Sequence, residues 1–192
     1  MPFRPVIMKP GPKRIAAACA LAGFQQKIIY PPITDGCGKV WDKPSALLIA
    51  VACAAGESSG NAWAYRINFP DTPQQSTDFG MFEINNKYNS EWFGPIKTPM
   101  QANWAIYYDC ADMAYQVWQW AVKDRKKANG PPMDDWKPWH AVSGGGFSRE
   151  RYGGKSWLDW AEFGIEQMNA ARSVGATLDQ IASIDMDPLV YD

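Results

Sequence analysis

The chain has 192 residues, 46% of them hydrophobic, which suits one globular domain with a sizeable core. Its formal net charge of -1 excludes a general basic field that would attract nucleic acid or an anionic membrane. No stretch of the sequence reaches the roughly 20 consecutive apolar residues that are needed to span a bilayer. We therefore expect no nucleic-acid partner and no membrane span.

The first 40 residues are predicted to form an N-terminal arm with a short helix. Residues 1–14 are rich in proline and are expected to be irregular. The small apolar run at residues 15–24 follows several basic residues and so resembles a weak signal peptide. The two prolines before it and its many alanines speak against that reading. We interpret the run as a short helix of the mature protein.

Residues 41–172 contain the main predicted elements. An apolar helix runs from about residue 44 toward Glu57, and residues 79–84 are predicted to be a strand of a small sheet or hairpin. A long helix is predicted to begin at Thr98 and Pro99, and an amphipathic helix near Ser156. Residues 173–192 are expected to form a C-terminal tail with a short helix. We find no linker, so one mostly helical domain is predicted.

The cysteines and the single histidine limit the possible metal chemistry. Cys19, Cys37, Cys53 and Cys110 lie far apart without a C-x-x-C motif, and His140 is the only histidine. This pattern argues against a structural zinc site, and we expect neither a metal nor another cofactor. Two interpretations of the cysteines remain open, namely a few disulfides or buried free thiols.

The ten tryptophans are more than a chain of this length usually has. Large aromatic rings often belong to the core. They also suit sugar binding, because pyranose faces stack on flat rings and indole N–H groups donate hydrogen bonds. The tryptophans are therefore consistent with both roles.

Two carboxylates are candidates for acid chemistry. Glycoside cleavage needs a protonated acid at the leaving oxygen and a negative charge near the oxocarbenium-like transition state. Glu57 shares a helix face with Ala54 and Cys53, so burial is expected to raise the pKa of its carboxyl group. The alternative is a solvated glutamate at a helix end. Small residues around Glu57, such as Gly56, leave room for a ligand and favour the first interpretation.

Asp78 is the natural second carboxylate. It lies at the start of the predicted strand, where a turn could direct it across a cleft. The alternative is a side chain that caps an Asx-turn, which is a common role for aspartate. The pattern alone does not choose between the two.

Three segments resemble proteins of the lysozyme superfamily. They are Glu57-Ser58-Ser59-Gly60, then Asn68 with the run STDFGMFEIN at residues 76–85, and Asn129-Gly130 followed by Met133 and Trp136-Lys137-Pro138-Trp139. In this order they are similar to c-type lysozymes, and the first two are also similar to lytic transglycosylases. The resemblance covers roughly residues 45–140. It implies an α+β, predominantly α-helical lysozyme-like fold with a small antiparallel β-hairpin region, and a lysozyme-like catalytic domain at residues 41–172.

The resemblance also implies roles for individual residues. Glu57 matches the general acid, and Asp78 matches the nucleophile or electrostatic stabiliser. Trp136 matches a tryptophan that packs on the catalytic glutamate, and Asn85 matches a residue that binds near the N-acetyl group of the sugar. Tyr88 stands where lysozymes carry a tryptophan that stacks on sugar.

The sequence departs from the family at other positions near the expected cleft. Glu83 replaces the usual glutamine and adds a third acid, which either lines the cleft or pairs with a neighbour such as Lys87. The glycine-rich stretch at residues 139–147 and 151–154 is similar to the endings of phage-encoded wall hydrolases. It is either a substrate lid, with Tyr152 or Phe147 contacting the glycan, or a solvated loop. His140 is expected to be structural.

Together these features favour a muramidase that binds peptidoglycan glycan strands. A lytic transglycosylase is the nearest alternative, because it uses one glutamate and the 6-hydroxyl group of the sugar. A non-catalytic wall-binding or virion structural protein is the alternative of another class. We expect action at the cell wall, outside the cytoplasm, by a phage enzyme that is released during lysis or carried in the virion beside other virion or tail proteins. A secreted bacterial enzyme with an unusual leader is the alternative.

Overall fold

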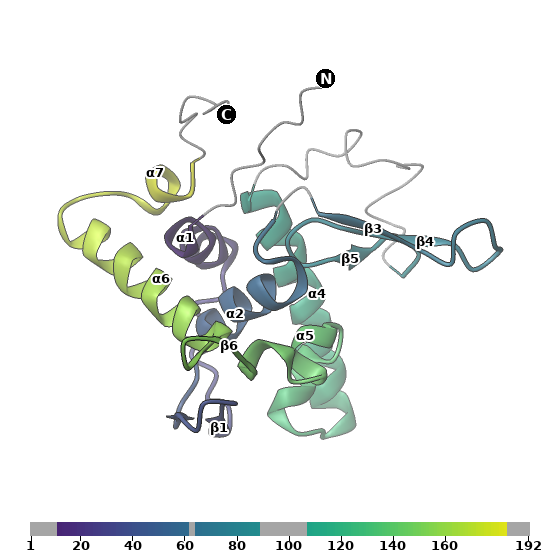
Figure 1. Ribbon diagram of the computed structural model, residues 1–192, viewed down its shortest axis with the longest axis horizontal. Coiled ribbons are helices and arrows are strands. Elements are labelled where there is room, and N and C mark those ends of the chain that lie inside the picture. Colours follow the sequence, from purple (N-terminus) through teal and green to yellow (C-terminus); the bar gives the residue numbers. More distant parts are fainter. Residues whose placement is uncertain (1–10, 62–63, 89–106, 184–192) are drawn as a thin grey trace.

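The computed structural model describes residues 11–61, 64–88 and 107–183. Helices pack around one central helix, and small antiparallel sheets lie at the periphery (Figure 1). The prediction of an α+β, mainly helical chain is therefore confirmed. Thr98 and Pro99, the expected start of the long helix, lie outside the described residues.

The central helix is α2 (Ala46–Ser58), which ends next to the candidate acid Glu57. The hydroxyl group of Ser45 caps it by accepting a hydrogen bond from the backbone N–H of Leu48 over 3.1 Å. All residues from 46 to 55 are buried. A helix that is apolar all round is stable only inside a core, which explains why α2 is surrounded by other elements.

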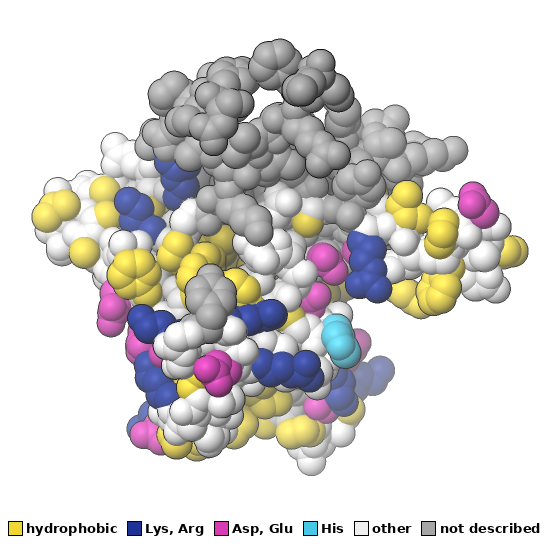
Figure 2. Space-filling model, viewed as in Figure 1, with side chains coloured by type: hydrophobic (Ala, Val, Ile, Leu, Met, Phe, Trp, Pro, Cys, Tyr) yellow, Lys and Arg dark blue, Asp and Glu magenta, His cyan; other side chains and the backbone are white. Residues whose placement is uncertain are grey.

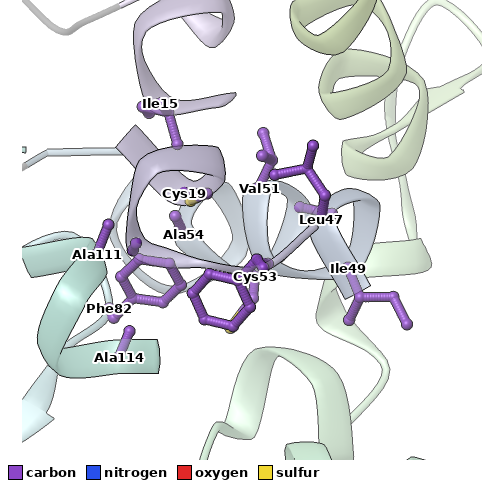
Figure 3. Close-up of a cluster of buried hydrophobic side chains, with 14 of the residues drawn as sticks. Ile15, Cys19, Leu47, Ile49, Val51, Cys53, Ala54, Phe82, Ala111 and Ala114 are labelled. Atoms are coloured by element: carbon purple, nitrogen blue, oxygen red, sulfur yellow. The ribbon is translucent and has the colours of Figure 1, made fainter. Parts of the chain in front are cut away.

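Helix α1 (Pro12–Ala22) packs against α2, α4 and α6. The prediction of irregular chain is wrong for residues 12–14, because Pro12 fits the first turn of a helix, where its missing N–H is not needed. Residues 1–10 lie outside the described residues. Most of α1 is buried, including Cys19, which lies beside α2 in the cluster drawn in Figure 3. The N-terminal helix thus belongs to the same core as α2.

Helix α6 (Trp157–Ser173) crosses close to the start of α1. Its first turn is held by a capping box between Ser156 and Asp159, as the sequence predicted. A Cβ atom at Gly164 would lie 2.6 Å from the backbone of Pro12, so only glycine permits this approach. The short helix α7 (Leu178–Ala182) also packs on α1, beside which it lies in Figure 1.

The sheet nearest the candidate acids has the strand order β3-β4-β5. Its antiparallel strands are β3 (Tyr65–Asn68), β4 (Ser76–Phe79) and β5 (Ile84–Asn85). The prediction of one strand over residues 79–84 is wrong. Gly80 and Glu83 have φ angles of 73° and 46°, and the N–H of Glu83 donates to the carbonyl of Gly80 over 3.0 Å. These left-handed positions turn the chain between β4 and β5.

The remaining strands form two short pairs. They are β1 (Ile33–Thr34) with β2 (Val40–Trp41), and β6 (Glu150–Tyr152) with β7 (Lys155–Ser156). The buried carboxylate of Asp35 accepts hydrogen bonds from Trp41 Nε1 and Ser156 Oγ, both over 3.0 Å. This aspartate therefore joins the loop of the first pair to the start of α6.

The long helix α4 (Tyr107–Ala128) is followed by three short helices. These are η2 (Pro132–Trp136), α5 (His140–Ser143) and η3 (Gly146–Ser148). The buried Asp135 of η2 accepts hydrogen bonds from Tyr30 and from Arg125 of α4. This pair of opposite charges fixes η2 against α4, and α4 forms one wall of the candidate site.

No disulfide joins any of the four cysteines, so the interpretation with disulfides is wrong. Cys19, Cys53 and Cys110 are buried, whereas Cys37 is partly exposed. Burial raises the pKa of the Cys19 and Cys53 thiols, which therefore stay neutral and pack as small apolar groups. Among the described residues, no helix is both long and apolar enough to cross a bilayer.

Candidate active site

A cleft of about 910 Å³ is lined by residues of α2, the β3–β5 sheet, α4, η2 and the start of α5. It brings together Glu57, Asp78 and Glu83, which are far apart in the sequence. Asn85 and Tyr88 line it as well. Acidic side chains lie near the histidine, drawn in cyan, on the face of the molecule that Figure 2 shows. Of the seven predicted site residues, five thus line one cleft.

Glu57 lies in the last turn of α2 and is partly buried. Its Oε1 atom accepts a hydrogen bond from the backbone N–H of Ala141 over 2.7 Å. Burial raises the pKa of Glu57, and the negative charge of Asp78 adds to this. The hydrogen bond from Ala141 and the charges of His140 and Arg66 oppose the shift without cancelling it. An acid proton therefore belongs on Oε2, because Oε1 is already an acceptor.

Two neighbours of Glu57 in the sequence fix its surroundings. A Cβ atom at Gly56 would lie 2.8 Å from the Cβ atom of Ala141, so a glycine allows α5 to reach Glu57. The hydroxyl group of Ser58 donates to the carbonyl oxygen of Met81 over 2.9 Å. This bond ties the end of α2 to the turn between β4 and β5. The sheet and the helix are thus joined next to the candidate acid.

Asp78 is held by two amide groups. The side-chain amide of Asn68 donates to Oδ2 over 2.7 Å, and that of Asn85 donates to Oδ1 over 2.6 Å. Asn85 also donates to Ser76 Oγ over 3.0 Å. Because both donors lie on strands next to β4, the sheet itself fixes the orientation of the carboxylate. The interpretation of Asp78 as an Asx-turn cap is therefore wrong.

Glu83 is the third carboxyl group of the cleft. It is partly buried, and within the described residues it forms no ion pair with Lys87 or any other side chain. Burial raises the pKa of Glu83 to about 7, and the negative charges of Glu57 and Asp78 contribute to this. At neutral pH a large share of Glu83 therefore carries a proton.

Of the two predicted residues that remain, Trp136 does not line the cleft. Trp136 is fully buried, and its ring packs against Phe24 at 5.8 Å and Trp139 at 5.7 Å between centroids. It is Trp139 that lines the cleft, and its Nε1 donates to the carbonyl oxygen of Phe82 over 3.1 Å. The side chain of Tyr152 lies outside the described residues.

The sequence also led to expectations for Phe147, His140 and Tyr88, and the structure places these three residues in different surroundings. Phe147 is buried, so it is not available to a glycan. His140 is exposed and lines the cleft. The side chain of Tyr88 is 81% exposed, which suits a residue that contacts a ligand more than a residue of the core.

Three residues at or beside the cleft, Asn68, Arg66 and Trp120, have no role predicted from the sequence. Asn68 holds Asp78, Arg66 lies directly opposite Asp78 in the register of β3 and β4, and Trp120 lines the α4 wall with 44% of its surface exposed. For Asn68 and Arg66 the sequence does contain a signal, which is the group of turn formers at residues 70–73 between the segments that form β3 and β4. Such a turn predicts a hairpin, in which β3 lies beside Asp78.

The arrangement suits proton transfer next to a fixed negative charge. One carboxyl group has a raised pKa and a free oxygen atom, and a second carboxyl group is held by amide donors in the same cleft. Among the described residues, no cluster of His, Cys, Asp and Glu side chains could hold a metal ion.

No protein-family model, curated protein or solved structure matches this chain. The assignment of a function therefore rests on the residues of the cleft.

Proposed function

We propose that this chain is a muramidase of lysozyme-like fold, which hydrolyses the β-1,4 bond between N-acetylmuramic acid and N-acetylglucosamine in peptidoglycan. The observation that carries the proposal is the pairing of Glu57, with its raised pKa, and the amide-bound Asp78 in one cleft. Glycosidases use one carboxyl group as an acid and another as a carboxylate. The three segments that resemble c-type lysozymes support the same fold and reaction.

In the proposed reaction Glu57 is the general acid. Its proton passes from Oε2 to the glycosidic oxygen as the bond from that oxygen to the anomeric carbon breaks. Water then supplies a hydroxyl group to the anomeric carbon and returns a proton to Glu57. Because this step needs a protonated Glu57, activity is expected to fall as the pH rises through its raised pKa.

Asp78 is the carboxylate that stabilises the positive charge at the anomeric carbon. Its oxygen atoms each accept one hydrogen bond, from Asn68 and Asn85, and each has a further lone pair. A carboxylate fixed in this way needs no reorganisation when the charge develops. Tyr88 and Trp120 supply exposed aromatic faces in the same cleft for stacking on sugar rings.

One observation favours a second candidate, a lytic transglycosylase. The two short amide contacts of Asp78 suit an electrostatic role better than a nucleophilic one. With Glu57 as the only group that transfers protons, the 6-hydroxyl group of the sugar could replace water as the nucleophile. The two reactions differ in their products, which are a reducing end and an anhydro end.

The deciding experiment is mass spectrometry of the soluble products from purified peptidoglycan. The wild type, Glu57→Gln and the control Glu166→Gln are compared, since Glu166 is an exposed residue of α6 that does not line the cleft. Reducing muropeptides from the wild type and Glu166→Gln, but not from Glu57→Gln, are expected. Anhydro products would select the transglycosylase. No release from any of the three proteins, on walls of several chemotypes, would refute both enzymatic candidates.

The proposal includes a partner and a site of action. The substrate is the glycan strand of the bacterial wall, so the protein would act outside the cytoplasm. Delivery as a phage lysis enzyme or as a virion component, together with other virion or tail proteins, belongs to the same proposal. Immunodetection of the protein in purified virions and in lysates distinguishes these routes.

A further inference from the structure

Glu83 is held by its backbone in the cleft. Its N–H donates to the carbonyl oxygen of Gly80, and the preceding carbonyl, that of Phe82, accepts from Trp139 Nε1 over 3.1 Å. The residue has a φ angle of 46°, in a region that non-glycine residues seldom adopt. Such a conformation costs free energy and persists only where the surroundings fix it. The side chain is thus fixed at its base in the cleft.

The carboxyl group of Glu83 has no partner of its own within the described residues, although it is partly buried. Glu57 on α2 and Asp78 on β4 are the acids that interact with it, and the positive charge of Arg66 on β3 acts against them. Among the described residues, the other charged or titratable groups that line the cleft are Tyr88 after β5, His140 at the start of α5, Asp124 and Arg125 on α4, and Asp134 and Lys137 at η2. Arg125 and Lys137 are already paired, with Asp135 and Asp134.

We propose that Glu83 contacts the bound glycan as a neutral carboxylic acid and donates a hydrogen bond from its hydroxyl group to an oxygen atom of an N-acetylated sugar. This inference rests on the proposed function and deepens it, because it assigns to Glu83 a part in binding that differs from the roles of Glu57 and Asp78. An N-acetylated sugar offers suitable acceptors in its acetamido carbonyl and its hydroxyl groups.

The three acids of the cleft differ in the donors around them, which supports this division of roles. Asp78 accepts two amide hydrogen bonds and Glu57 accepts one from a backbone N–H, whereas Glu83 accepts none from the described residues. Hydrogen bonds of this kind favour the charged form of a carboxyl group. Without them, and next to two other acids, the neutral form of Glu83 is favoured to about pH 7. Ionisation would remove its donor and add a third negative charge to the cleft.

The consequence is a pH dependence of binding with a defined direction. If only the neutral form of Glu83 donates to the glycan, binding is complete below the pKa of Glu83 and weakens as the pH rises through it. With a pKa of about 7, the dissociation constant is expected to rise about tenfold between pH 6 and pH 8. Glu83→Gln keeps a side chain of the same shape with an N–H donor at every pH, so this rise should disappear.

The test is calorimetric titration of the full chain with a β-1,4-linked N-acetylglucosamine trisaccharide at pH 6, 7 and 8. The wild type and the control Glu166→Gln should both lose affinity about tenfold over this range, by linkage to the Glu83 proton. Glu83→Gln should bind with a nearly constant dissociation constant. Any pH effect that comes from another group of the cleft persists in Glu83→Gln, so comparison with the wild type removes it. Circular dichroism of each variant verifies that it is folded.

The outcomes separate this inference from the proposed function. A wild type whose affinity does not change with pH, or a Glu83→Gln variant as pH-dependent as the wild type, overturns the role of Glu83 while peptidoglycan cleavage stands. A pH dependence that Glu83→Gln abolishes, in a protein that releases no muropeptides, supports Glu83 as a binding residue and refutes the enzymatic proposal. No binding by the wild type at any pH counts against both.

Discussion

The backbone N–H of Ala141 donates a hydrogen bond to Oε1 of Glu57 over 2.7 Å, between residues 84 positions apart in the sequence. The approach of the two elements depends on Gly56, where a Cβ atom would lie 2.8 Å from that of Ala141. The contact is between a methyl group and a backbone position, so neither side can rotate away. The glycine before the candidate acid therefore sets the distance between α2 and α5.

Gly56→Ala should lower the activity by more than its loss of stability would explain. The added methyl group must push α5 from α2 and so break the hydrogen bond to Glu57. We expect an overpacking cost of about 1–3 kcal/mol in the free energy of unfolding. A small displacement of a catalytic group can cost about a hundredfold in rate, so at least a tenfold loss of kcat/KM is expected. Urea denaturation and muropeptide release measure the two effects.

Gly164→Ala is the matched control. Its Cβ atom would meet the backbone of Pro12 at 2.6 Å, at the contact of α6 with α1. Gly164 does not line the cleft. This variant should therefore lose stability while kcat/KM, measured where it is fully folded, stays close to the wild-type value. Equal effects of both substitutions on kcat/KM would contradict the role given to Gly56.

Asn68→Ala should lower kcat/KM with little loss of folding. Asn68 lies on β3, an edge strand of the sheet, and its side-chain amide donates a hydrogen bond to Asp78 Oδ2 over 2.7 Å. A hydrogen bond to a charged group contributes about 1.5–3 kcal/mol, which corresponds to about a tenfold to hundredfold loss if it acts in the transition state. Initial rates of muropeptide release over a range of substrate concentrations give this number.

Asn169→Ala is the control for Asn68→Ala, because Asn169 is an exposed residue of α6 outside the cleft. Its kcat/KM should equal that of the wild type. The double variant Asn68→Ala with Asn85→Ala adds information, since both amides bind the same carboxylate. Its loss should differ from the sum of the single losses, as expected for residues that share a partner. An unchanged kcat/KM in Asn68→Ala would show that Asp78 does not depend on Asn68 for its role in the reaction.

Local patterns were enough to predict the helices that matter here. The apolar run at residues 46–55 behind Ser45 predicted α2, and the capping box of Ser156 and Asp159 predicted the start of α6. Both signals act over a few residues and need no knowledge of the rest of the fold. Glu57 could be singled out for the same reason, because its helix face is apolar.

Contacts between distant segments could not be predicted in this way. No periodicity links Ala141 to Glu57, since this contact depends on how α5 packs against α2. Trp136 and Trp139 show the same limit. Both lie in one aromatic segment and both are buried, and only the packing of the whole fold decides that Trp139, but not Trp136, borders the cleft.

Asp135→Asn should be the most destabilising of the conservative substitutions. Asp135 is fully buried and binds Arg125 Nε over 2.9 Å and the hydroxyl group of Tyr30 over 3.1 Å. Removal of one partner from a buried ion pair costs about 3–5 kcal/mol, because the other charge is left without compensation. Arg125 is slightly exposed, so the lower end of that range is expected. Urea denaturation gives the difference in the free energy of unfolding.

The surface pair of Lys137 and Asp134 provides the comparison for the buried one. Its N–O distance is 2.7 Å, shorter than that of the buried pair, but the lysine side chain is 69% exposed. Exposed pairs contribute about 1 kcal/mol or less, so Asp134→Asn should have a small effect. If Asp134→Asn cost as much as Asp135→Asn, burial would not be what gives the inner pair its importance.

Glu83 should also make the stability of the fold depend on pH, in a direction that its raised pKa fixes. An unfolded glutamate has a pKa near 4.5 and the folded Glu83 one of about 7, so the folded state binds the proton more tightly. The resulting stabilisation is complete below pH 4.5 and is lost as the pH rises to about 7.

Glu83→Gln has no proton to lose. Its free energy of unfolding, relative to the wild type, should therefore rise from pH 5 to pH 7 and stay level from pH 7.5 to pH 9. Because the group is only partly buried, solvent screening limits this rise to the order of 1 kcal/mol. Urea denaturation of both proteins at each pH gives the difference. A difference between Glu83→Gln and the wild type that is the same at pH 5 and pH 9 would mean that Glu83 is an ordinary solvated carboxylate, and the role proposed for it in glycan binding would fail with it.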